Sequence, residues 1–508
     1  MKKLTFILFA CFFANISNVS AFCGFYVAKA DTKLYNEASQ VILVRDGNKT
    51  TISMSNDFSG SAKDFAMVVP VPVVLQRENI RIINRSLFDS FDAYSSPRLA
   101  EYYDQDPCQM IYAEKLSRPK PSTAARPTEE NEMAKSADAL GVTIEAEYSV
   151  GEYDILILSA TESVGLEKWL IANGYKIPAG AQEVLKPYIW SNTKFFVVKV
   201  NMEAYQSSGF QQLNPLQINF ESPKFMLPIR LGMANSKGNQ DLIIYALSKK
   251  GRIECTNYPT IEIPSNKNIP EFIKNDFGSF YKDLFARQWK TKGAKNVFLE
   301  YAWDISPNNY VKCDPCVSTP PNYSEIADAG VNWLNDNTYH YDSNKKNYYQ
   351  NENSNTLYFT RLHVRYNRAS FAQDLMFQET PNTQNFQARY VLTHPAQSSF
   401  NCEAAVPYLQ KTVQNRRKEL NELATLTGKS TTGYSDYVAR YNNLLPANKR
   451  LYDKNDSPVS FLPNNGDDND NFPNTTYPVI LLSFVFILSI LTTLLFVYLK
   501  KKVPIFES

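Results

Sequence analysis

The feature that most constrains this chain is an uncharged segment near its C-terminus. The segment runs from Val479 to Leu499, and an apolar helix needs about 20 residues to cross the hydrocarbon core of a bilayer. Three lysines, Lys500–Lys502, follow it at once, and positive charge stays on the cytoplasmic side of a membrane. We therefore expect one membrane-spanning helix at 478–499 and a short cytoplasmic tail at 500–508.

The other end of the chain has the pattern of a secretory signal peptide. Two lysines precede the apolar run Leu4–Phe13, and small residues end at Ala21, which is where such a peptide is cut. The alternative is a lipid-attachment site at Cys11, but its apolar run would be very short. With residues 1–21 removed, nearly all of the chain should lie outside the cytoplasm, in a single-pass membrane protein.

Composition sets limits on the exported part. Aromatic residues make up 13% of the chain, so it can bury a large core and is not disordered as a whole. The formal charge of the chain is +2, and leaving out Lys2, Lys3, Lys500–Lys502 and Glu507 brings the ectodomain to −2. A nearly neutral surface offers no electrostatic footprint for nucleic acid. The tail is too short to be a domain, so any message across the membrane needs an envelope protein as partner.

The exported part divides into five segments. Alternating apolar and polar residues predict a strand-rich first segment, and mixed strand and helix patterns predict a central α+β domain. The segment between them holds prolines and charges but few large apolar residues, which predicts disorder. Periodic apolar residues then predict a helical piece, and an Asn-, Asp- and Pro-rich segment predicts a flexible stalk. In chain order the segments are 22–114, 115–139, 140–401, 402–446 and 447–477.

We expect an α+β fold with mainly antiparallel sheets, helices packed on them, and a helical C-terminal piece. In the strand "VTIEAEYSV", Glu145 and Glu147 should share a solvated face opposite Ile144, Ala146 and Tyr148. A carboxylate pair for glycoside chemistry is the less favoured interpretation of these two glutamates.

The helical piece contains two apolar stripes at helical spacing. Gly428 should end the first helix, and Pro446 follows the second. The basic side chains of the first helix should lie on its solvent side. The stripes are Val406, Leu409, Val413, Leu420 and Leu423, and then Tyr434, Val438, Tyr441 and Leu445; the basic residues are Lys411, Arg416, Arg417 and Lys418.

Six cysteines remain once the signal peptide is removed. An even number in an oxidising compartment predicts three disulfides, although the sequence does not fix their pairing. We expect a local Cys313–Cys316 bridge, then Cys23–Cys108 around the N-terminal strands, and Cys255–Cys402 by elimination.

The motif "CDPC", residues 313–316, permits three interpretations. A redox couple needs a lowered thiolate pKa, usually from a helix that begins at the first cysteine, and Pro320 and Pro321 do not allow one there. A zinc site needs two further ligands, and the nearest histidine is His340. A structural disulfide is therefore favoured, a redox role and a metal site stay open, and no cofactor is expected.

The three histidines, His340, His363 and His394, carry no motif. The sequence contains no HExxH, no GxSxG and no glycine-rich phosphate loop. A Ser-His-Asp site assembled from distant segments is recognised by geometry alone, so a hydrolase stays open. Without a motif, each histidine is expected to be structural.

Several stretches carry a resemblance to a known family. "DFAMVVPVP", "ESPKFMLPIRLGM", "CDPC", "FTRLHVRY" and "NFQARYVLTHP" resemble the bacterial domain-of-unknown-function family 2330, from Cys23 to about Gly428. The resemblance implies a secreted, membrane-anchored bacterial protein with no known activity, substrate or catalytic residue. The Cys313–Cys316 pair matches the family's own pattern.

These features favour a binding or structural module anchored in the cell envelope. They include a large aromatic-rich ectodomain, no catalytic motif and a very short tail. The first alternative is a thiol-disulfide oxidoreductase in which Cys313 attacks and Cys316 resolves the mixed disulfide. The second is a hydrolase with a dispersed catalytic site.

Overall fold

The structure is a computed structural model, and it describes most of the predicted ectodomain. The chain divides into two compact units, Met1–Val459 and Ser460–Ser508, and every described residue belongs to the first. The described residues are 25–28, 39–56, 65–109, 142–173, 181–201, 203, 205, 213–235, 238–306, 318–334, 339–342, 347–350 and 356–451.

The predicted signal peptide (1–21), the loop at 115–139, the membrane helix (478–499), the tail and most of the stalk lie outside the described residues. They stay predictions. In the part of the chain that the structure describes, no helix combines the length and apolar character needed to cross a bilayer.

A five-stranded antiparallel sheet has the strand order β1-β4-β9-β8-β7. The hairpin of β7 and β8 turns at Gly151 (φ +57°), a left-handed conformation that glycine adopts without steric cost. The strands are β1 (Phe25–Ala28), β4 (Phe65–Val71), β7 (Val142–Val150), β8 (Tyr153–Ala160) and β9 (Lys194–Val200).

A nine-stranded sheet is mixed, with the order β14-β16-β19-β12-β2-β3-β10-β5 and β21 beside β16. The β12–β2 and β14–β16 pairs are parallel. The strands are β2 (Ser39–Asp46), β3 (Lys49–Asn56), β5 (Ile80–Ile82), β10 (Leu216–Glu221), β12 (Gln240–Ser248), β14 (Thr260–Glu262), β16 (Val297–Asp304), β19 (Tyr358–Tyr366) and β21 (Phe386–Gln387).

Smaller sheets complete the α+β fold, which is confirmed, although the sheets are less uniformly antiparallel than expected. The sheet β15-β22-β6 is parallel, whereas β11-β20-β13 and β17-β18 are antiparallel. Their strands are β6 (Arg98–Tyr103), β11 (Met226–Leu227), β13 (Ile253–Cys255), β15 (Lys267–Asn268), β17 (Tyr339–Asp342), β18 (Asn347–Gln350), β20 (Leu375–Glu379) and β22 (Arg389–His394). The helices are α2 (Ser86–Ser95), α3 (Ser163–Ala172), α4 (Ala181–Trp190), α6 (Gly232–Asn235), the 3-10 helix η2 (Glu271–Asp276), α7 (Phe277–Lys292), α8 (Tyr323–Asp328), α9 (Ala405–Thr427) and α10 (Ser435–Asn442).

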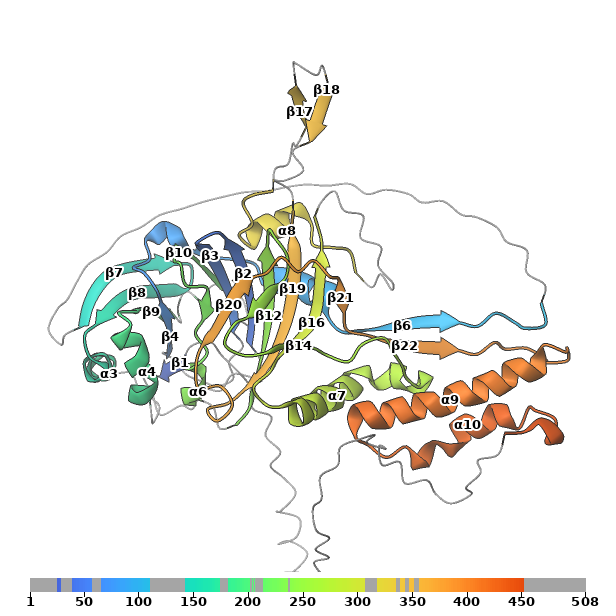
Figure 1. The fold of residues 1–508 in the computed structure, drawn as a ribbon. Helices are drawn as coiled ribbons and strands as arrows, with labels where there is room; N and C mark the ends of the chain where they lie inside the picture. Colours follow the sequence, from blue (N-terminus) through green and yellow to red (C-terminus); the bar gives the residue numbers. More distant parts are fainter. Residues whose placement is uncertain are drawn as a thin grey trace, which may run out of the picture. The chain divides into compact units, whose positions relative to one another are not determined.

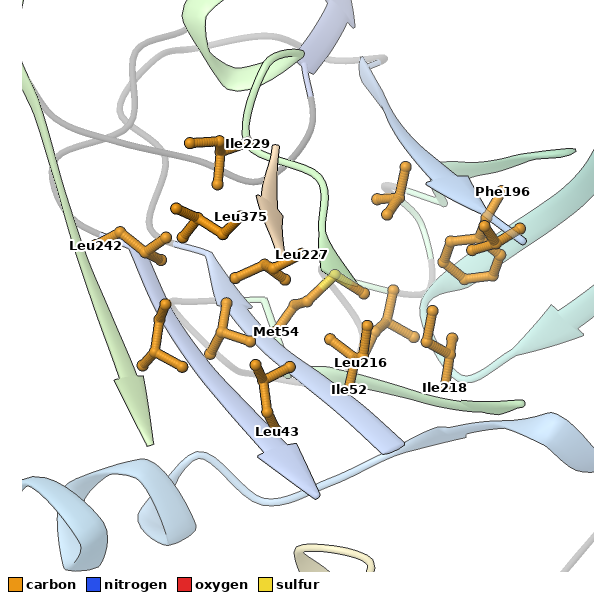
Figure 2. Close-up of a cluster of buried hydrophobic side chains, with 14 of the residues drawn as sticks. Leu43, Ile52, Met54, Phe196, Leu216, Ile218, Leu227, Ile229, Leu242 and Leu375 are labelled. Carbon is orange, nitrogen blue, oxygen red and sulfur yellow. The ribbon is translucent and has the colours of Figure 1, made fainter. Parts of the chain in front are cut away.

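The main hydrophobic core lies between the two large sheets (Figure 2). Leu43 of β2 and Phe196 of β9 are fully buried in it. Because successive side chains of a strand point to opposite faces, Ile42 and Val44 pack on the other side of the nine-stranded sheet, against α2 and α8. Face-to-face sheets of this kind share one interior layer of interdigitated side chains.

Helices α3 and α4 cover the outer face of the five-stranded sheet (Figure 1). Phe195 and Val197 of β9 point to that face and pack with Leu166 of α3 and Leu185 of α4. The described fold is therefore layered as helices, sheet, sheet and helices. The α3 helix begins at Ser163, after Glu162 as its N-cap.

Two strands contain β-bulges that interrupt the alternation of side chains. The pairing of β7 with β8 is irregular between Ile144 and Ala146, so Ile144 packs toward α3 and α4 while Ala146 packs in the core between the sheets. The prediction that both lie on one face was wrong, because the extra residue, Glu145, reverses the pattern. Glu145 accepts a hydrogen bond from Ser159.

The second bulge lies at Glu300 of β16, where the pairing with β19 is irregular between Leu299 and Tyr301. Leu299 packs in the core between the sheets, whereas Tyr301 packs in the outer core beneath α2. Glu300 is the additional residue between them, and its side chain also turns to the outer face. The bulge thus brings a carboxylate under the helices.

The C-terminal piece is helical, as expected. Gly428 (φ +73°) ends α9 in the left-handed conformation that favours glycine. Leu409 and Val413 of α9 pack with Tyr441 and Leu445, which confirms these members of the two apolar stripes, whereas Tyr434 is 42% exposed.

One prediction about α9 was wrong. Lys411 and Lys418 are exposed, but the side chain of Arg416 is only 1% exposed. Its Nη2 donates to Glu271 at 2.9 Å, and its Nη1 donates to Glu419 at 2.9 Å. The ring of Tyr437 on α10 covers the guanidinium at 4.5 Å. The neighbouring helix α10 therefore helps to bury this arginine, which the apolar pattern of α9 alone does not predict.

Candidate functional site

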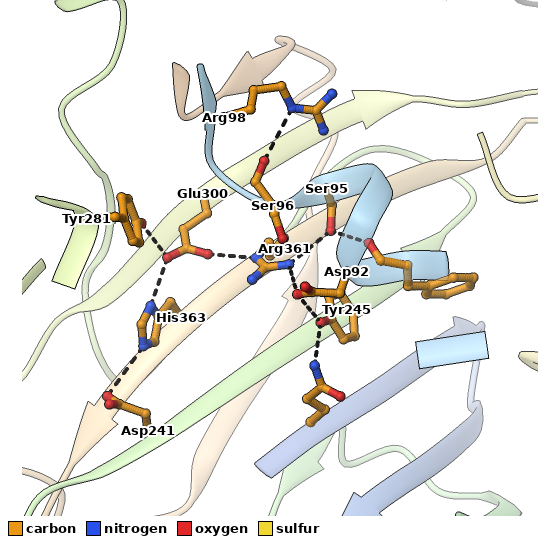
Figure 3. A network of polar contacts seen from close by, with 12 residues as sticks. Asp92, Ser95, Ser96, Arg98, Asp241, Tyr245, Tyr281, Glu300, Arg361 and His363 are labelled. Carbon is orange, nitrogen blue, oxygen red and sulfur yellow. Dashed lines mark hydrogen bonds and ion pairs between the residues drawn. The ribbon is translucent and has the colours of Figure 1, made fainter. Parts of the chain in front are cut away.

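Two candidate sites in the described residues gather polar side chains from distant segments. The first, which we call the charge network, lies on the outer face of the nine-stranded sheet between α2 and α7 (Figure 3). The second, which we call the proline pocket, lies where the five-stranded sheet meets the segment 222–230 and β20.

Glu300 is the centre of the charge network. Its carboxylate is 1% exposed and accepts hydrogen bonds from Tyr281 Oη at 2.5 Å and from Arg361 Nε at 2.7 Å. His363 Nδ1 lies 2.8 Å from the same carboxylate. A buried carboxylate is tolerated only with such partners, and the bulge makes them reachable.

The network extends from Glu300 in two directions. Arg361 Nη1 donates at 2.7 Å to Asp92 of α2, which also accepts from Tyr245 Oη at 2.8 Å. On the other side, His363 Nε2 lies 3.4 Å from Asp241, and Arg365 donates to both oxygens of Asp241 at 2.7 Å. The network therefore ties β12, β16 and β19 to α2 and, through Tyr281, to α7.

The charged groups of the network shift one another's pKa. Burial alone would raise the pKa of Glu300, but His363 and Arg361 outweigh it and lower the pKa to about 2. Burial would likewise lower the pKa of His363, but Glu300 and Asp241 raise it above its ordinary value of 6.5. Glu300 is therefore an anion near neutral pH, and His363 keeps its proton to a higher pH than a free imidazole does.

These shifts predict a pH dependence of stability. Because the pKa of Glu300 is lowered, its contribution is complete above pH 4.5 and is lost as the pH falls toward 2. Because the pKa of His363 is raised, its contribution is complete below pH 6.5 and is lost as the pH rises through the folded-state pKa. We expect His363→Gln to remove the loss of stability that wild type shows at high pH. That loss amounts to about 1.4 kcal/mol for each unit by which the pKa of His363 is shifted. Urea unfolding of wild type and variant between pH 5 and 9 checks this. If the difference in unfolding free energy between wild type and variant grew with rising pH, the prediction would be contradicted.

The geometry of the described histidines does not suit a hydrolase. Both ring nitrogens of His363 face carboxylates, and its ring stacks on Phe285 at 3.7 Å. His394 Nε2 lies 2.8 Å from Glu101, and its Nδ1 lies 3.7 Å from Glu271. A Ser-His-Asp site needs one nitrogen on the nucleophile. Among the described residues, neither histidine has a serine or threonine hydroxyl on its ring, and the side chain of His340 is outside them.

The cysteines differ from the predicted pairing. Cys108 and Cys402 form a disulfide, so the predicted Cys23–Cys108 and Cys255–Cys402 pairs were wrong. Strands β6 and β22 run parallel, with Tyr103 opposite His394. Their C-terminal ends therefore lie together and bring the two cysteines within reach, although they are 294 residues apart in sequence.

The remaining cysteines give no described redox site. Cys255 is free and buried, and burial raises the pKa of its thiol, which is the opposite of what an attacking thiolate requires. Cys23, Cys313 and Cys316 lie outside the described residues, so the local Cys313–Cys316 bridge and its redox and metal alternatives stay predictions. Within the described residues, no group of His, Cys, Asp and Glu could hold a metal ion.

The proline pocket has a volume of about 490 Å³, which lies in the range of small-molecule sites. Five prolines line it together with Phe220, Met226 and Met376. Polar groups from loops reach into it, including Ser191, Thr193 and Asn257. The prolines are Pro70, Pro72, Pro187, Pro223 and Pro228.

Asp374 holds the polar base of the proline pocket. Its Oδ1 accepts from Tyr188 Oη at 2.6 Å and from the backbone N–H groups of Ile229 and Arg230 at 3.0 and 3.1 Å. Its Oδ2 accepts from Arg230 Nε and Nη2 at 3.2 and 2.8 Å. Five donors to one nearly buried carboxylate fix Tyr188 and Arg230 in place before any ligand arrives. No motif or spacing in the sequence links Tyr188, Arg230 and Asp374, so they were not predicted.

The geometry defines the class of protein first: an α+β protein of several sheets with C-terminal helices, a disulfide that is consistent with an extracytoplasmic location, and a preformed pocket. The chain belongs to the DUF2330 family, uncharacterized proteins conserved in bacteria, which it matches over residues 17–378. No curated protein and no solved structure matches it.

The family match confirms the resemblance and places the two sites within it. All lining residues of the proline pocket and the core of the charge network lie between residues 17 and 378. The match ends within β20, so "NFQARYVLTHP" and the helices α9 and α10 lie beyond it. Cys402 also lies beyond it, so the disulfide joins the matched part to the C-terminal piece.

Proposed function

We propose that this chain is a ligand-binding module of the bacterial cell envelope, anchored by the helix at 478–499 with its ectodomain outside the cytoplasm. The observation that carries the proposal is the proline pocket, whose polar base is already fixed by Asp374. Concave, mostly apolar sites with a few convergent polar groups are the usual places for small ligands.

The charge network supports binding over catalysis. Its buried charges are paired with one another, and both ring nitrogens of His363 face carboxylates. Such a network braces strands to helices. The disulfide supports the extracytoplasmic location, because disulfides persist in oxidising compartments. An envelope protein as partner also belongs to the proposal.

Filling the proline pocket tests the proposal. Thr193 lies on its wall and is only partly exposed, so Thr193→Trp places an indole in the cavity. We would screen a fragment set of small acids, amides and alcohols by ligand-observed NMR. We expect hits that bind wild type, and we expect Thr193→Trp to bind those hits at least tenfold more weakly. Thr143→Trp, on the exposed edge strand β7, is the matched control and should retain the hits. If both variants retain every hit, the pocket is not the ligand site.

A further inference from the structure

We infer that the ligand of the proline pocket carries a carboxylate on a compact apolar body. The inference rests on the proposed function, since it names the class of ligand for that pocket. It is carried by the two cationic side chains that line the cavity and by the walls around them.

Arg230 is the first cation. Its side chain is 21% exposed, and its guanidinium lies 4.6 Å from the centre of the Tyr188 ring. Two of its nitrogens, Nε and Nη2, donate to Asp374 Oδ2. Its Nη1 does not donate to Asp374, and the side chain of Tyr188 also interacts with the guanidinium. An arginine held in this way by one carboxylate keeps donors for a second carboxylate, and the rigid fork of Arg suits that group.

Lys224 is the second cation. It lines the same pocket and is exposed. Its backbone N–H donates to Ser222 Oγ at 3.2 Å, which holds its loop, but its ammonium forms no ion pair with any described residue. The charged lining therefore consists of two cations, Lys224 and Arg230, and one anion, Asp374. Since Asp374 is already bound to Arg230, one positive charge is left for a ligand.

The walls of the pocket determine the shape and polarity of the rest of the ligand. Five prolines, Phe220 and two methionines form the apolar walls of the pocket, and rigid rings and polarisable thioethers favour a flat apolar group. Asn257 lines the pocket, but its Nδ2 donates to Asp374 O at 2.7 Å and its Oδ1 accepts from Met376 N at 3.0 Å. This amide is therefore engaged by the protein, which leaves the cations to select the ligand by charge.

A pair of compounds that differ in charge alone tests the inference. N-acetyl-L-phenylalanine and N-acetyl-L-phenylalaninamide have nearly the same shape, but only the first carries a carboxylate. We expect the full chain, purified with detergent, to bind the acid about tenfold more tightly than the amide in NMR titrations. Lys224→Gln should reduce this preference to about threefold or less, and Lys411→Gln, an exposed lysine on α9, should leave it unchanged.

The possible results separate the inference from the proposed function. Equal binding of acid and amide, both blocked by Thr193→Trp, overturns the carboxylate inference and leaves the pocket as a binding site. Tighter binding of phenyl phosphate than of the acid assigns the anion to phosphate and also overturns it. If fragments bind in the pocket but N-acetyl-L-phenylalanine does not bind at about 10 mM, the carboxylate inference is overturned and the proposed function stands. No pocket-dependent binding of any compound removes the proposed function as well.

Discussion

Glu300→Gln is expected to lower the free energy of unfolding by about 3–5 kcal/mol, the usual cost of breaking a buried ion pair by removing one partner. Glutamine keeps the shape of the side chain but loses the negative charge. Arg361 and His363 would then lie buried beside a neutral group, and Arg361 would have only Asp92 as its anion. Urea unfolding at pH 6, where both shifts favour the ion pairs, gives the largest effect.

An exposed ion pair provides the matched control. Lys249 Nζ lies 2.6 Å from Asp46, and their side chains are 36% and 33% exposed. Water screens such a pair, so Asp46→Asn should cost at most about 1 kcal/mol. A double-mutant cycle of Glu300→Gln with His363→Gln should be non-additive, because the two groups are in contact. A cost for Glu300→Gln no larger than that for Asp46→Asn would contradict the role that we assign to the charge network.

Local periodicity in the sequence was enough to predict many elements. The strand predicted at "QVILVRD" corresponds to β2, and its odd- and even-numbered apolar side chains enter two different cores. The apolar positions Leu409 and Val413 of α9 were also predicted correctly. Each of these depends on neighbours within one or two turns or one strand, which a pattern of apolar residues records directly.

The sites were not predictable, because they depend on bulges and on pairing between distant segments. In "VFLEYAWD", strict alternation would send Leu299 and Tyr301 to the same face, and the bulge at Glu300 separates them. No local signal marks that extra residue. Likewise, Tyr188, Arg230 and Asp374 meet only because α4, the segment after β11 and the segment before β20 converge at one pocket.

The disulfide pairing shows the same limit. Parallel strands need a long connection between them, and the sequence does not show that β6 pairs with β22. The guesses for Cys108 and Cys402 relied on nearness in sequence and on elimination, whereas the pairing depends on the register of Tyr103 with His394. Arg416 was misplaced for a related reason: its partner Glu271 and the ring of Tyr437 come from other elements.

The double variant Cys108→Ser, Cys402→Ser is expected to lose about 2–5 kcal/mol of unfolding free energy, as is usual when a native disulfide is removed. The bridge closes a loop with a sequence separation of 294 residues, and a longer closed loop restricts the unfolded chain more. It is also a covalent link, in addition to the backbone, between the matched part of the chain and the segment that leads into the C-terminal helices, so the loss should be concentrated there. Hydrogen exchange should increase in α9 and α10 while β2 and β12 stay protected.

Reduction and a third cysteine separate this effect from a general loss of packing. Adding a reductant to wild type should reproduce the double variant, because both remove the same bond. Cys255 is free and buried, so Cys255→Ala should lose as much stability on addition of the reductant as wild type does, apart from its own small packing loss. Peptide mapping without reduction should recover Cys108 joined to Cys402. If the reductant leaves the hydrogen exchange of α9 and α10 unchanged, the parallel pairing of β6 and β22 holds the helices without the bridge. The predicted loss of stability is then wrong.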